Sequence, residues 1–98
     1  KMADVAHDGL ARAVRPAHSM FDGDTVFGLA TSDTELGRQP AAMGSTSSRQ
    51  RAVNQLLTAA ADTFATACAH AVIAAERRGE LPSYAELCPS AFRIRSLS

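Results

Sequence analysis

The sequence predicts a chain of the α/β class that forms part of a larger assembly. Apolar residues recur every three or four positions in residues 2–14 and again in 53–75, which is the spacing of a helix with one buried face. Between them, residues 25–31 are almost wholly apolar and begin with β-branched and aromatic side chains, as in a strand covered on both faces. A buried strand needs neighbours for its backbone hydrogen bonds, and the chain offers no second strand.

Residues 1–15 are predicted to form the first helix, with charged side chains opposite one apolar stripe. Gly9 inside this helix costs about 1 kcal/mol relative to alanine, so its presence favours another element packed very close to it. Pro16 is expected to end the helix, because the residue before a proline is pushed out of the α-helical region. The apolar stripe comprises Met2, Val5, Ala6, Gly9, Leu10, Ala13 and Val14.

Residues 22–31 are predicted to hold an acidic pair, Asp22 and Asp24, followed by the strand. In extended backbone the side chains of residues i and i+2 point to the same side, so both carboxylates can face one site. Two carboxylates held close raise the pKa of one of them, which suits it to accept or relay a proton. A turn with an Asp cap is an equally good interpretation of the spacing alone. His18, in the preceding loop, is expected to make an ordinary hydrogen bond or to join a proton relay.

Residues 32–48 are rich in Gly, Pro, Ser and Thr and are predicted to form a surface loop. A serine at position 47 or 48 is expected to cap a long helix over residues 49–78, which Gly79 would stop. Its alanine-rich stripe requires a partner surface that approaches closely. The tail, residues 79–98, is predicted to be irregular with at most one short turn. The stripe comprises Val53, Leu56, Leu57, Ala60, Phe64, Ala67, Cys68, Ala71, Val72 and Ala75.

Composition excludes several classes of protein. Ten basic and ten acidic residues cancel, which excludes a nucleic-acid module driven by phosphate neutralisation. Cys68 and Cys88 fit neither a disulfide framework nor a zinc site, so we expect reduced thiols and neither metal nor cofactor. No stretch approaches the roughly 20 apolar residues needed to cross a bilayer, and the start lacks a signal-peptide hydrophobic region. We therefore expect a cytoplasmic protein without a membrane partner.

Short motifs suggest three other kinds of site, and each lacks a required part. Aspartyl phosphatases also have an Asp-x-Asp pattern followed by Thr, but there an apolar strand precedes the first Asp, whereas here the apolar run follows. A calcium loop would need another oxygen ligand at Val26 and a glycine at Phe27. Metal-dependent phosphohydrolases use a His-Asp pair like His7 and Asp8, but no further His and Asp on neighbouring helices complete such a site.

A longer stretch of sequence resembles the L-aminopeptidase/D-esterase family of self-processing N-terminal-nucleophile hydrolases. The resemblance rests on AHDGLARAVRP at 6–16, HSMFDGDTVF at 18–27 and LAT at 29–31, and it is looser along the long helix and at 87–92. Within the family the chain is most similar to the nylon-oligomer (6-aminohexanoate-oligomer) hydrolases. The resemblance implies a four-layer αββα sandwich, to which this chain would contribute helix, buried strand, long helix and irregular tail.

The resemblance also implies a reaction. In the family, a precursor cuts itself into a large and a small chain, and the exposed N-terminal Ser or Thr of the small chain forms an acyl-enzyme. The family's acidic pair corresponds to Asp22 and Asp24, with the implied role of orienting the nucleophile and taking part in proton transfer. Asp at both positions is the nylon-oligomer hydrolase pattern, whereas β-peptidyl relatives have Ser-Gly-Glu. The implied partners are the large chain of the same precursor, a peptide or amide-oligomer substrate, and further copies in a homo-oligomer.

The resemblance places the nucleophile upstream of the first helix, and no residue in 1–98 corresponds to it. The family's oxyanion-stabilising Asn and its Lys or Tyr belong to the large chain. We therefore expect residues 1–98 to be the C-terminal part of the small chain and to be inactive alone. The alternative is a non-catalytic helical interaction domain that docks a partner through its alanine-rich helix.

Overall fold

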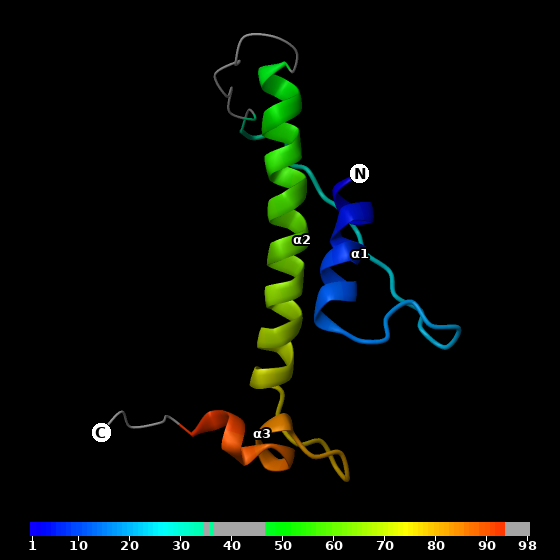
Figure 1. Ribbon diagram of the computed structural model, residues 1–98, viewed down its shortest axis with the longest axis vertical. Coiled ribbons are helices and arrows are strands. Elements are labelled where there is room, and N and C mark those ends of the chain that lie inside the picture. The colour runs from blue at the N-terminus through cyan, green and yellow to red at the C-terminus, as the bar shows by residue number, and fades with distance from the viewer. Residues whose placement is uncertain (35, 37–46, 94–98) are drawn as a thin grey trace.

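The computed structural model describes residues 1–34, 36 and 47–93, whose regular structure is helical. Helix α1 spans Met2–Ala13 and α2 spans Ser48–Ala74. A short helix α3, Tyr84–Leu87, and a 3₁₀ helix, Pro89–Phe92, follow. In Figure 1, α1 lies alongside the middle of α2, and the short helix α3 lies near the C-terminal end of α2.

The predicted α/β class, with a buried strand in an αββα sandwich, is wrong: the described residues contain no strand. Residues 25–31 have no regular secondary structure and run as an extended segment in Figure 1, and no backbone hydrogen bond joins them to another described segment. Phe27 and Leu29 are 90% and 86% exposed. Apolar and β-branched residues favour an extended backbone, but a strand also needs a neighbour that donates and accepts hydrogen bonds. In the described part of the chain, β-type pairing is limited to one bridge, between Arg78 and Leu81.

Helix α1 packs against α2 at Gly9. The buried residues of α1 are Ala6 and Gly9, and those of α2 are Ala52 and Ala61. A Cβ on Gly9 would overlap the backbone oxygen of Ala61 and would lie 3.0 Å from the Cβ of Phe64. The missing side chain therefore lets the two backbones approach, and the close approach predicted at Gly9 is confirmed.

Helix α2 begins with a capping box. The Ser47 hydroxyl accepts a hydrogen bond from the Gln50 backbone N–H at 3.2 Å, and the Gln50 side chain accepts one from the Ser47 N–H at 3.1 Å. These bonds satisfy backbone donors that a helix start otherwise leaves unpaired. The cap predicted at position 47 is confirmed. Of the loop predicted at 32–48, residues 35 and 37–46 lie outside the described residues.

Helix α2 ends at Ala74, before the end predicted at residue 78. Gly79 therefore does not terminate α2. Its φ is +55°, and it is the residue after Arg78 in a tight turn. Two reciprocal backbone hydrogen bonds of 3.0 and 2.9 Å between Arg78 and Leu81 close this turn. Positive φ at the first central residue is what a type II′ turn requires, and glycine meets it at the lowest cost. The tail is more regular than predicted, because Ser83 caps α3 through a second capping box.

By length and composition alone, α2 could cross a membrane, contrary to the expectation from sequence. An 18-residue window of the helix has a mean hydropathy of 1.4, and only 6% of that window is buried. However, Asp62 lies in the middle of α2 and forms a 3.0 Å ion pair with Arg12 of α1. An ionised Asp at the centre of a bilayer costs roughly 2.5–3.5 kcal/mol. This charge and the packing of α1 favour a helix that contacts protein.

Candidate active site

The loop after α1 folds into a hydrogen-bonded turn that carries the first predicted carboxylate. The Ser19 backbone N–H donates to Oδ2 of Asp22 at 3.0 Å, and the Asp22 N–H donates to the Ser19 carbonyl at 3.2 Å. The Phe21 N–H donates to the Ser19 hydroxyl at 3.3 Å. Short polar side chains commonly close such turns by bonding nearby backbone. Asp22 is therefore held by its own loop.

These bonds lower the pKa of the Asp22 carboxyl below its ordinary value. The largest cause is the hydrogen bond from the Ser19 backbone, followed by the Ser19 side chain, and the nearby His18 adds a smaller effect of the same sign. Hydrogen bonds to the charged form of a carboxyl favour that form. Asp22 is therefore not the carboxyl of the pair whose pKa is raised. Asp22 is thus an ionised hydrogen-bond acceptor at neutral pH.

The second predicted carboxylate, Asp24, has a different partner. Its Oδ2 lies 3.7 Å from Nδ1 of His18, and the two side chains are 34% and 45% exposed. The His18 ring in turn packs against the ring of His7, which α1 supplies, with centroids 5.2 Å apart and a tilt of 57°. Nδ1 of His7 is buried and has no hydrogen-bond partner among the described residues.

The structure gives the two carboxylates different principal partners, although His18 lies near both. Asp22 belongs to the turn with Ser19, whereas Asp24 ends a row of side chains that runs through His18 to His7. Sequence reasoning considered His7 with Asp8, as part of an incomplete metal site, and missed this contact. The direction in which the chain turns after the helix decides the contact, and the residue types alone do not reveal that direction.

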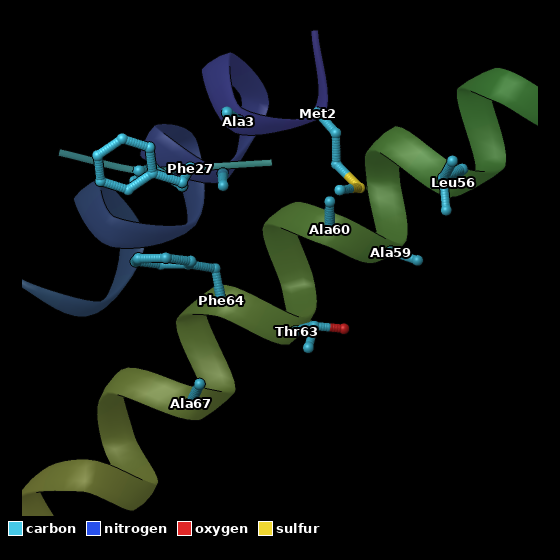
Figure 2. Close-up of a pocket in the computed structure, with 11 residues that line it drawn as sticks. Met2, Ala3, Phe27, Leu56, Ala59, Ala60, Thr63, Phe64 and Ala67 are labelled. Atoms are coloured by element: carbon cyan, nitrogen blue, oxygen red, sulfur yellow. The ribbon is translucent and has the colours of Figure 1, made fainter. Parts of the chain in front are cut away.

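Residues just after the acidic pair form one wall of an apolar groove of about 420 Å³ between α1 and α2. Figure 2 shows Met2 and Phe64 reaching between the two helices, with Phe27 on the extended segment beside them. A Cβ built on Gly28 would lie 3.7 Å from the Cβ of Ala3, so this segment passes close to the first turn of α1. The segment after the carboxylates thus lies close to α1 and lines the same groove as residues of α2.

The site is suited to holding a proton or orienting a reacting group. It offers an ionised carboxylate, a second carboxylate beside an imidazole, and a further imidazole behind it. Within residues 1–34, 36 and 47–93, no group of three or more His, Cys, Asp or Glu side chains is placed to hold a metal ion.

Comparison with known proteins identifies the family. Peptidase family S58 matches residues 1–81. A protein of Mycobacterium tuberculosis named as an uncharacterized aminopeptidase is 39% identical over 92 residues, which cover 94% of this chain and 27% of the relative. A protein of Mycobacterium leprae with the same description is 40% identical over 92 residues, 94% of this chain and 25% of the relative.

The chain spans about a quarter of the length of these curated relatives. No solved structure matches it. The family match includes both long helices and the acidic pair between them. By this match over most of its length, the chain belongs to peptidase family S58.

Proposed function

We propose that this chain is part of a peptidase that hydrolyses amide bonds, and that Asp22 and Asp24 belong to its catalytic machinery. The observation that carries the proposal is the match to peptidase family S58 over residues 1–81, a range that includes the acidic pair. The names of the mycobacterial relatives support an aminopeptidase. Amide oligomers such as those of 6-aminohexanoate are a further substrate class, supported by the Asp-Gly-Asp pattern at 22–24.

In the proposed reaction, the hydroxyl oxygen of an N-terminal Ser or Thr attacks the amide carbon. The carbon–nitrogen bond breaks, the hydroxyl proton passes to the leaving amine, and the acyl group stays on the nucleophile as an ester. Water then hydrolyses this ester to a carboxylic acid and restores the hydroxyl. Asp22, as an ionised acceptor, would orient the nucleophile, and Asp24 with its imidazole neighbour would take part in the proton transfer.

The nucleophile is proposed to belong to the same precursor but to lie outside residues 1–98. Two observations support a larger working unit: the relatives are about four times longer, and large apolar side chains are exposed beside the acidic pair. Met20 and Phe21 are 99% and 100% exposed, and Phe27 is 90% exposed. Apolar clusters of this kind mark surfaces that another chain covers. We propose that the large chain of the precursor covers them.

The test uses the full natural polypeptide that carries this chain. Asp22→Asn and Asp24→Asn should each lower hydrolysis of an amino-acid amide by about 10²- to 10⁴-fold, the usual contribution of a positioned acid or base. Asp33→Asn is the matched control, because Asp33 is an exposed Asp on the same segment, and it should leave the rate unchanged. Wild-type hydrolysis and self-cleavage in both Asp22 and Asp24 variants would contradict the proposal.

The second candidate is a non-catalytic helical interaction domain. It is favoured by the exposed apolar side chains of α2, where Leu56 is 44% exposed and Val72 and Ile73 are each 52% exposed. This alternative requires the 98 residues to form a stable fold alone. Far-UV circular dichroism and hydrogen exchange on the isolated chain separate the two, because a catalytic segment that depends on its precursor should fold poorly without it.

A further inference from the structure

We propose that His18 is a positioning residue, which holds the carboxylate of Asp24 in its working orientation and is itself held by His7. The inference rests on the proposed function of Asp24 and adds a residue to it. It assigns His18 no contact with substrate. The imidazole acts through the carboxylate beside it.

The first observation is the contact itself. Nδ1 of His18 faces Oδ2 of Asp24 at 3.7 Å, which is an ion-pair distance when the ring is protonated and slightly longer than a direct hydrogen bond. Contacts at catalytic groups are often long in the free protein and shorten when substrate binds. Because both side chains are partly exposed, the pair adds little to stability. Its effect is therefore expected in the orientation of Asp24.

The second observation is the backbone of His18. Its φ is +57°, in the left-handed region where a non-glycine residue is strained. Glycine would adopt this conformation at lower cost. The chain instead carries an imidazole there, and the left-handed residue aims that imidazole at Asp24 and His7. The other non-glycine residue with positive φ in the described part of the chain is Ser32, at +62°.

The third observation is the support behind His18. His7 is a residue of α1, and its ring packs against the ring of His18 with centroids 5.2 Å apart. Helix α1 is fixed in turn by its close contact with α2 at Gly9. Sites whose residues are backed by a regular element keep their geometry better than sites on loops alone. The row from α1 through His7 and His18 to Asp24 provides such backing for a carboxylate on a loop.

The test compares two substitutions in the full natural polypeptide. His18→Gly keeps the positive φ but removes the imidazole. His18→Asn tolerates the same φ and keeps an N–H donor near the position of Nδ1. We expect His18→Gly to lower kcat for an amino-acid amide by about 10- to 100-fold, the size of effect expected for a misplaced catalytic group, with KM nearly unchanged. His18→Asn should recover most of kcat, and Ser32→Gly, the backbone control, should keep it.

A double variant separates this inference from the proposed function. If His18 acts through Asp24, adding His18→Gly to Asp24→Asn should cause no further loss, because coupled residues are not additive. Wild-type kcat in His18→Gly beside an impaired Asp24→Asn would overturn the inference alone. The inference would also be overturned if kcat fell as far in His18→Asn as in His18→Gly. A kcat in the double variant that shows the two single losses multiplied would overturn it as well. A fully active Asp24→Asn would overturn this inference together with the catalytic role proposed for Asp24, and full activity of Asp22→Asn as well would contradict the proposed function. Circular dichroism of each variant identifies a loss caused by unfolding, and rescue by His18→Asn then decides.

Discussion

Replacing Gly9 with alanine tests the contact on which both long helices depend. In an exposed helix interior this substitution stabilises by about 1 kcal/mol, because alanine has the higher helix propensity. At Gly9 the new Cβ would overlap the backbone oxygen of Ala61 and would lie 3.0 Å from the Cβ of Phe64. Backbone inside α2 cannot turn aside as the end of a flexible side chain can. The two helices would have to separate.

The magnitude follows from two opposing effects. Overpacking a close contact costs typically 1–3 kcal/mol, and the backbone overlap at Ala61 places Gly9→Ala near the upper value. The higher helix propensity of alanine offsets about 1 kcal/mol of this cost. We therefore expect the free energy of unfolding to fall by about 2 kcal/mol.

The assay is urea unfolding of the full natural polypeptide, followed by far-UV circular dichroism. Ala11→Gly is the matched control, because Ala11 is exposed on the same helix. This substitution should lower the free energy of unfolding by about 1 kcal/mol, the difference in helix propensity alone. The sign of the Gly9 effect is decisive. A Gly9→Ala variant more stable than wild type would refute the close packing of α1 on α2.

Three further predictions concern the polar contacts. Ser47→Ala should lower the free energy of unfolding by about 1 kcal/mol through loss of the α2 cap, measured by urea unfolding. The pKa of the Glu86 carboxyl is lowered from its ordinary 4.5, chiefly by the backbone N–H of Ser83. The ionised carboxylate therefore stabilises the fold above pH 4.5, and this contribution is lost as the pH falls below that value. Glu86→Gln should therefore destabilise at pH 7 but not near pH 3, measured as Tm against pH. Asp62→Asn should cost less than about 1 kcal/mol, since its pair with Arg12 is exposed, and 1 M salt should abolish the difference.

The two long helices could be predicted from sequence because their signals are local. The spacing of apolar residues repeats within each helix, Ser47 offers a cap next to the first turn, and Gly9 is a costly residue that close packing explains. The strand could not be predicted in the same way. Residues 25–31 do adopt the extended backbone that their composition favours, but pairing and burial depend on other segments. Composition alone does not show whether such segments lie beside them.

In the candidate site, too, the residues could be predicted from sequence but their contacts could not. The pair Asp22 and Asp24 could be found from sequence, since two carboxylates around a glycine are visible in the residue order. Their neighbours could not, because the turn at Ser19 and the left-handed backbone at His18 decide which donor each carboxylate meets. The same geometry lowers the pKa of Asp22, because its carboxylate accepts hydrogen bonds from Ser19.

The geometry of the acidic segment depends on α1 at two points. Upstream of Asp24, the ring of His18 packs on His7, and downstream Gly28 passes close to Ala3. Ala3 and His7 are one helical turn apart and therefore share a face of α1, while Gly9 lies against α2. The carboxylate of Asp24 is thus positioned by α1, and the position of α1 depends in turn on the absence of a side chain at Gly9. Separation of α1 from α2 would move both attachment points of the acidic segment together, so its orientation relative to α2 would change even where its local hydrogen bonds persist.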